Sequence, residues 1–188
     1  SICGGETRYY PCKFENEFIP KISDLEELID ENTVAILYNF PSNPTGGTLD
    51  EQQRDELLDF AVKNDLWIIS DEVYDRIVFD GKHVSFMGTD YDKTLIVNSF
   101  SKTFAMTGWR IGYIISTNIE AMKQIIKMQY YITACSNDAM QYAVLAAMEH
   151  ASDYPDKIAK EFQQRCELIV KRLNEMPGVE CHKPKGAI

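Results

Sequence analysis

Lys102 is one of only two charged side chains between Asn98 and Ser116, and Arg110 follows it eight positions later. The whole stretch reads NSFSKTFAMTGWRIGYIIS. Burying a charged amine among such residues costs free energy, so a lysine at this place needs a chemical reason. In an apolar setting an amine is more readily deprotonated, which makes it a nucleophile toward carbonyl groups. We therefore interpret Lys102 as a candidate nucleophile.

Four short apolar runs rich in β-branched residues predict the strands that position this lysine. They are Thr33 to Asn39, Leu66 to Ser70, Thr94 to Ser99 and Arg110 to Ser116. Because these runs are apolar throughout, we expect strands buried on both faces, as in a mostly parallel sheet.

Helical patterns are expected to alternate with these strands through the first half of the chain. Ser23-x-x-Glu26 and Thr48-x-x-Glu51 have the spacing of capping boxes. Residues 118–148 predict two helices broken around TACSND, and a further long helix starts near Tyr154 and stops at the MPG sequence of residues 176–178. The helix expected after Thr48 has an apolar face made of Leu57, Leu58, Phe60 and Ala61. We expect four methionines of residues 118–148 to fill gaps in the core: Met122, Met128, Met140 and Met148.

Polar residues gather where the predicted strands end. The sequence NFPSNPTGG follows the first strand, SDEVYDRI the second and NSFSK the third, and Arg110 opens the fourth. In open α/β sheets, ligands bind at the carboxyl ends of the strands. The pattern therefore predicts one site to which all four places contribute.

These residues resemble the fold-type-I, pyridoxal-phosphate-dependent aminotransferases of classes I and II. The shared motifs are the N-P-T-G turn, the D-x-x-Y pair and S-x-S-K-x-x-x-x-x-G-W-R, in that order. The similarity covers nearly the whole chain and is greatest to the aspartate and aromatic subgroup. It implies a three-layer α/β/α large domain with a mostly parallel sheet, ending in a long interdomain helix, and pyridoxal 5'-phosphate as cofactor.

The resemblance also implies roles for individual residues. Lys102 would hold the pyridoxal aldehyde as a Schiff base, and Asp71 would keep the pyridine nitrogen protonated so that the ring can accept electrons. Asn43 and Tyr74 match the family's donors to the phenolic oxygen of the ring.

The cofactor phosphate needs fixed positive charge and hydroxyl donors. Arg110 supplies a fork-shaped cation and Ser99 a hydroxyl, with Ser101 as a weaker candidate. Each of these site residues, taken alone, could equally be a turn residue, a surface residue or an ion-pair partner. Only their occurrence together, in this order, favours a cofactor site. We expect Glu72 and Asp75 to be structural or solvent-facing, and His83, His150 and His182 to have ordinary polar roles.

Composition excludes several classes of protein. Asp and Glu number 29 against 19 Lys and Arg, the formal net charge is -10, and no basic block occurs, so we expect no nucleic-acid partner. No apolar run approaches a membrane span of roughly 18 residues and no secretory signal is visible, so we expect a cytoplasmic protein without a membrane partner. The five scattered cysteines, Cys3, Cys12, Cys135, Cys166 and Cys181, are expected to be reduced thiols without a metal.

We expect residues 1–150 to be the central part of a cofactor-binding large domain, incomplete at its N-terminus, and residues 151–188 to be a long helix leading into a truncated small domain. The predicted function is transamination between an amino acid and a 2-oxo acid by a homodimeric full-length parent, with the isolated piece inactive. Two alternatives stay open: a carbon–sulfur β-lyase with the same cofactor, and a non-enzymatic, aminotransferase-like regulatory domain.

Overall fold

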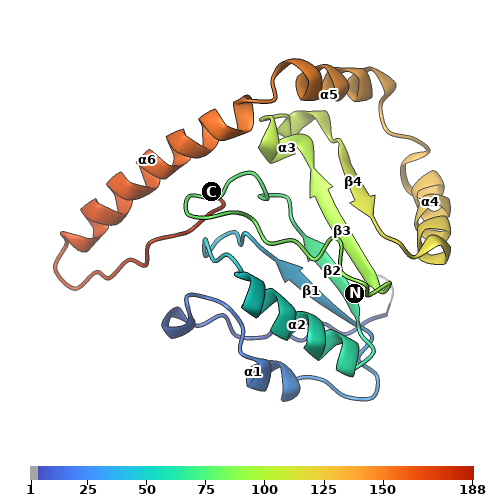
Figure 1. The fold of residues 1–188 in the computed structure, drawn as a ribbon, viewed down its shortest axis with the longest axis horizontal. Coiled ribbons are helices and arrows are strands. Elements are labelled where there is room, and N and C mark those ends of the chain that lie inside the picture. Colours follow the sequence, from blue (N-terminus) through green and yellow to red (C-terminus); the bar gives the residue numbers. More distant parts are fainter. Residues whose placement is uncertain (1–3) are drawn as a thin grey trace.

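The computed structural model describes residues 4–188, so that Cys3 lies outside the described residues. Its helices and strands follow the α/β pattern expected from the sequence (Figure 1). In chain order they are η1 (Phe14–Asn16), α1 (Ile22–Glu26), β1 (Ala35–Asn39), α2 (Glu51–Lys63), β2 (Trp67–Asp71), β3 (Thr94–Ser99), α3 (Phe100–Thr103), η2 (Thr107–Trp109), β4 (Gly112–Ile115), α4 (Ile119–Thr133), α5 (Asp138–His150) and α6 (Tyr154–Asn174).

The four strands form one sheet in the order β1-β2-β3-β4. The β1–β2 and β2–β3 pairs are parallel, and β4 runs antiparallel to β3. The prediction of an α/β fold with a mostly parallel sheet is therefore confirmed. Because β4 is antiparallel, its first residue lies at the same edge of the sheet as the last residue of β3, and Ser99 pairs with Gly112.

One face of the sheet carries the main core. Tyr38 and Ile68 are fully buried there, and Leu57, Phe60 and Ala61 of α2 pack against them. The ring of Phe86 stacks on Tyr38 with 5.3 Å between centroids. The opposite face is less covered by this chain, because Leu37 of β1 is 55% exposed. The expectation that every strand is buried on both faces is thus wrong for the chain as described, since burial alternates along β1.

Two details of the predicted helices are corrected. Helix α2 does have a capping box, but Asp50 and Gln53 form it instead of Thr48 and Glu51. Asp50 accepts from the backbone N–H of Gln53 at 2.8 Å, and the Gln53 side chain accepts from the N–H of Asp50 at 3.0 Å. Helix α1 starts after Lys21 without a side-chain cap, because Ser23 already lies inside it.

The connection from β2 to β3 contains no helix, so the regular alternation of strands and helices fails there. Phe86 and Tyr91, both in this connection, cover the sheet instead. The two helices around TACSND and the long helix from Tyr154 are confirmed.

Helices α4, α5 and α6 run around the periphery of the sheet (Figure 1). Met128 and Met148 are more than half exposed, so they do not fill core gaps as expected. Between residues 4 and 188, none of the helices combines the length and the apolar character that a membrane crossing requires.

Candidate functional site

The predicted site residues lie at the carboxyl edge of the parallel strands. Asn39 and Asp71 are paired across the last positions of β1 and β2. The Asn39 side chain donates to the carbonyl of Asp71 at 3.4 Å and accepts from the backbone N–H of Asn43 at 3.1 Å. Asn39 therefore ties the turn that carries Asn43 to the strand end that carries Asp71.

Asn43, Tyr74 and Lys102 come together although they lie on three separate segments. The amide of Asn43 donates to the Tyr74 hydroxyl at 2.9 Å. The Lys102 amine lies over the Tyr74 ring, 5.6 Å from its centroid, which is cation–π geometry. Tyr74 is buried, whereas Lys102 is half-buried. The amine thus has an aromatic wall on one side and remains accessible to a small molecule.

Asp71 is half-buried and is the last residue of β2. One of its carboxylate oxygens accepts from the N–H of Val73 at 3.3 Å. This bond turns the chain sharply after β2 and leads directly into Tyr74.

Ser99, Ser101 and Arg110 occupy the corner between β3 and β4. Ser99 caps α3, because its hydroxyl accepts from the N–H of Ser101 at 3.1 Å. The same hydroxyl lies 2.9 Å from that of Ser101 and donates to the carbonyl of Ile111, the neighbour of Arg110, at 3.0 Å. Two hydroxyls and a guanidinium are therefore carried by one corner of the sheet.

Arg110 does not open β4, as the sequence suggested, but stands two residues before it in a left-handed conformation with φ 56°. Its side chain is exposed and donates to the carbonyl of Thr107 at 2.9 Å. An exposed guanidinium anchored to its own turn is free to direct its remaining donors at an anion.

Sequence reasoning missed a buried ion pair behind the site. Glu72 is 3% exposed, so it does not face solvent, and its carboxylate lies 2.7 Å from Nε2 of His83. It also accepts from the Ser70 hydroxyl at 3.0 Å and from the N–H of Phe86 at 3.1 Å. The sequence did hint at this burial. Asp71 is the last residue of β2 and Glu72 follows it directly, and adjacent residues of an extended chain point to opposite faces of a sheet.

Burial alone would raise the pKa of Glu72, but hydrogen bonds from His83, Ser85 and the Phe86 N–H together lower it below the ordinary value. Asp75, three residues further on, is half-buried, and burial raises its pKa. One of the Asp75 oxygens is buried without a hydrogen-bond partner. Glu72 is therefore a structural anion, held charged on the covered face of the sheet.

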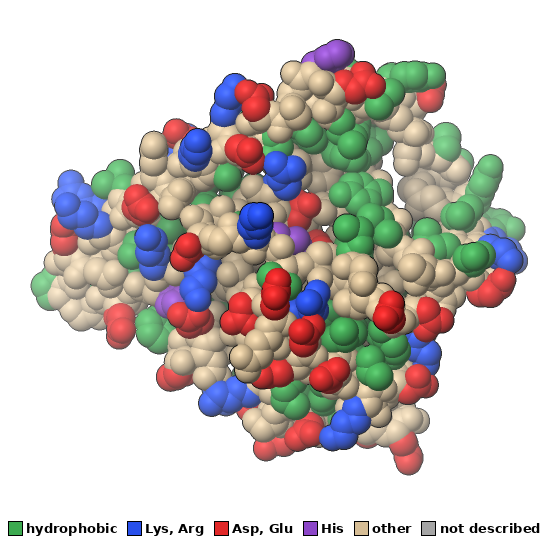
Figure 2. Space-filling view, viewed as in Figure 1, with side chains coloured by type: hydrophobic (Ala, Val, Ile, Leu, Met, Phe, Trp, Pro, Cys, Tyr) green, Lys and Arg blue, Asp and Glu red, His purple; other side chains and the backbone are tan. Residues whose placement is uncertain are grey.

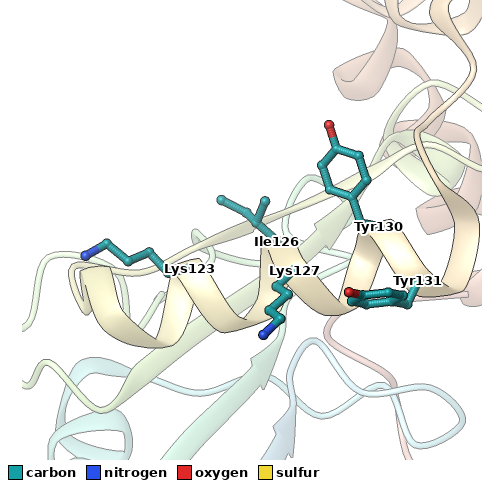
Figure 3. Close-up of a pocket in the computed structure, with 5 residues that line it drawn as sticks. All are labelled: Lys123, Ile126, Lys127, Tyr130 and Tyr131. Atoms are coloured by element: carbon teal, nitrogen blue, oxygen red, sulfur yellow. The ribbon is translucent and has the colours of Figure 1, made fainter.

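A surface hollow of about 440 Å³ lies away from these residues along α4. Lys123, Ile126, Lys127, Tyr130 and Tyr131 line it, and their side chains point in different directions from a single helix (Figure 3). Side chains that do not converge cannot surround a ligand, so we do not assign a site there. A smaller hollow of about 220 Å³ lies beside Ser99, Phe100 and Tyr113 and borders the predicted site.

The chain is similar to known aminotransferases over nearly its whole length. The chain is 39% identical to aspartate aminotransferase of Pyrococcus abyssi and 39% identical to aromatic-amino-acid aminotransferase 2 of Thermococcus litoralis, in each case over 99% of this chain and 49% of the relative. The crystal structure of an aromatic aminotransferase from Pyrococcus horikoshii OT3 superposes with a TM-score of 0.94 at 38% identity, covering 99% of this chain and 51% of that one.

The chain spans about half the length of these relatives. The family described as aminotransferase class I and II matches residues 1–188, and the residues that carried the resemblance lie together at one edge of the sheet. The chain belongs to the class I and II aminotransferases.

Proposed function

We propose that the protein containing this chain is a pyridoxal-phosphate-dependent aminotransferase that moves an amino group from an amino acid to a 2-oxo acid. The named relatives act as aspartate and aromatic-amino-acid aminotransferases, which supports this reaction class. The chain contributes the residues that hold the cofactor.

One observation carries the proposal: Lys102, Tyr74 and Asn43 are in contact at the carboxyl edge of the sheet. An amine that must bond an aldehyde, next to two donors that can reach a phenolic oxygen, matches the substituents of a pyridoxal ring. The donor set at the β3–β4 corner suits the phosphate, because Ser99, Ser101 and Arg110 offer hydroxyls and a guanidinium. The residues present therefore fit the group.

The bound cofactor would supply an electron sink for the carbanion formed at the substrate's Cα. Asp71 would pair with the pyridine N–H and keep the ring nitrogen protonated. Lys102 would anchor the aldehyde and, once displaced by the incoming amine, move a proton between the substrate's Cα and the cofactor's C4′. Asn43 and Tyr74 would donate to the phenolic oxygen.

A homodimer in the cytoplasm is part of the same proposal. Large apolar side chains of α4 and α5 lie at the surface, including Tyr131 and Ile132, and a second subunit would remove them from water. The cysteines Cys12, Cys135, Cys166 and Cys181 are free thiols, which fits a reducing compartment.

Borohydride reduction of the full-length protein, loaded with pyridoxal phosphate, tests the assignment. We expect peptide mapping to find the pyridoxyl group on Lys102, and Lys102→Ala to lose both the label and transamination. Lys93→Ala serves as the control, because that lysine pairs with Asp65 and lies outside the site. A label on any other lysine would overturn the proposal.

A further inference from the structure

Residues 184–187, which we call the 184–187 segment, lie between the turn that carries Asn43 and the loop that carries Tyr74. In Figure 1 the C-terminal end of the chain runs beside the loops that follow β1 and β2. The N–H groups of Lys185 and Gly186 both donate to the carbonyl of Gly46, at 2.9 and 3.2 Å. The segment is therefore bonded to the asparagine turn.

The same segment is bonded to the tyrosine loop. The N–H of Ala187 donates to the carbonyl of Ile77 at 2.9 Å, and the N–H of Phe79 donates to the carbonyl of Lys185 at 2.7 Å. Val78 and Gly186 form an antiparallel bridge. One short segment thus joins the two loops that also meet through the Asn43–Tyr74 hydrogen bond.

The fit between these three pieces leaves no room for an added methyl group. A Cβ at Gly46, whose φ is +73°, would lie 2.3 Å from the Cβ of Pro184. A Cβ at Gly186 would lie 2.8 Å from the carbonyl oxygen of Ile77 and 3.1 Å from the Cβ of Pro41. Because backbone atoms stand in the way, either substitution must move one of the loops.

Helix α6 holds the tyrosine loop from outside. Tyr74, Ile77 and Ala187 form a small buried cluster against which Phe162 of α6 packs. The side chain of Gln163 donates to the carbonyl of Phe79 at 3.2 Å. The ring of Tyr74 is therefore fixed by the segment and the helix together.

We propose that Gly186 and Ala187 are positioning residues that set the Tyr74 hydroxyl against Asn43. This inference rests on the proposed function, in which both side chains donate to the phenolic oxygen of the cofactor. A hydrogen bond between side chains on separate loops weakens steeply when one loop shifts by a fraction of an ångström. The 184–187 segment would thus tune the cofactor without touching it.

This effect can be measured in the full-length protein loaded with pyridoxal phosphate. The absorbance of the bound cofactor is followed as the pH is changed, and the pH at the midpoint of the change is compared between variants. Losing a donor to the phenolic oxygen should raise that midpoint, because the oxygen then holds the neighbouring proton more strongly. We expect Tyr74→Phe to raise it and Gly186→Ala to raise it by roughly half to one pH unit, the size of a weakened hydrogen bond. Lys183→Ala, which removes only an exposed pair with Glu167, should leave it unchanged.

A second variant covers the case in which Gly186→Ala does not fold. Ala187 has φ 63°, a conformation that glycine adopts readily, so Ala187→Gly should fold while removing the methyl group that packs in the Tyr74 cluster. We expect a smaller rise in the midpoint.

The outcomes separate this inference from the proposed function. If Tyr74→Phe shifts the midpoint but the folded Gly186 and Ala187 variants do not, the positioning role is wrong and the proposed function stands. If the unmodified protein gives no cofactor absorbance that depends on Lys102, the proposed function fails, and this inference fails with it.

Discussion

The β1–α2–β2 region buries its apolar side chains against one another, whereas the region from β4 to α5 leaves most of its own at the surface. Tyr38, Leu57 and Ile68 are almost fully buried, and all four residues of β4 are exposed. In Figure 2 many hydrophobic side chains accordingly lie at the upper right and right of the molecule, where Figure 1 places α5, β4 and α4. Apolar sequence alone therefore does not reveal which region forms the core.

The difference matters for the site because the two regions hold different parts of it. Asn43, Asp71 and Tyr74 project from the packed region and are tied together by hydrogen bonds. Arg110, on the β3–β4 corner, is exposed, and its side chain donates a hydrogen bond to the carbonyl of Thr107. The donors that we propose for the cofactor ring thus lie on the well-packed part of the sheet, and the cation that we propose for its phosphate lies on the less covered part.

The largest effect is expected from Phe86→Ala, which removes the ring stacked on Tyr38. Phe86 is 2% exposed, so the loss of stability should be about 3–5 kcal/mol. Met87→Ala, at the exposed neighbouring position, should cost less than about 0.5 kcal/mol. Urea unfolding of both variants measures the contrast, and similar losses would show that the packed region does not depend on this ring.

Next in size is the loss from Glu72→Gln, about 2 kcal/mol near neutral pH, because an amide replaces a buried carboxylate that is hydrogen-bonded to His83 and to the N–H of Phe86. Since the folded-state pKa of Glu72 lies below its ordinary value of 4.5, its contribution is present above that value and is lost as the pH falls through the folded-state pKa. Unfolding followed from pH 7 to pH 3 should show the two proteins converging in acid.

Glu56→Gln is the control for this titration, because Glu56 is exposed and accepts a hydrogen bond from the side chain of Gln52. A constant difference between Glu72→Gln and the unmodified protein at every pH would argue against a charged Glu72.

A smaller effect is expected at the start of α2. Asp50→Ala removes the capping box and should cost about 1 kcal/mol, whereas Thr48→Ala, at the position favoured by sequence pattern, should leave the helix cap intact. Thermal unfolding can resolve the pair. The reverse order of the two losses would restore the sequence-based assignment of the cap.

The smallest effect is expected on α4. Ile126 is 55% exposed, so Ile126→Ala in a dilute, monomeric sample should change stability by less than about 0.5 kcal/mol. A loss above about 1 kcal/mol that grows with protein concentration would instead show that a second subunit covers this helix. That result would assign the exposed region to an interface between subunits.

The strands, the two helices around TACSND and α6 were predictable from sequence because long apolar runs and helix breakers mark them. Residues as far apart as Asn43 and Lys102 could be grouped because each follows a strand, and the structure brings these two together around Tyr74. The roles assigned to the site residues remain predictions.

Other features depend on tertiary contacts that periodicity does not encode. Thr48 is followed three residues later by Glu51, and Asp50 by Gln53, and either side chain could complete a capping box. Only the backbone geometry therefore decides which of the two caps forms. From the sequence, Asp71 and Glu72 resemble an ordinary solvated acidic pair. In the structure Glu72 follows β2 on the covered face of the sheet, where it contacts His83 of the next loop. The bonds of the 184–187 segment are made by backbone groups, which leave no mark in a sequence pattern.

The connection between β2 and β3 has a part that is held by Glu72, from His83 to Phe86, and an exposed tip, residues 80–82. His83 and Phe86 are bound to the carboxylate, while Asp80, Gly81 and Lys82 are exposed, and a Cβ added to Gly81 would meet nothing within 4 Å. This tip is therefore the natural place to insert a peptide tag or a fluorescent reporter. A probe placed there would sit at the surface, one short loop away from Tyr74, without disturbing the sheet.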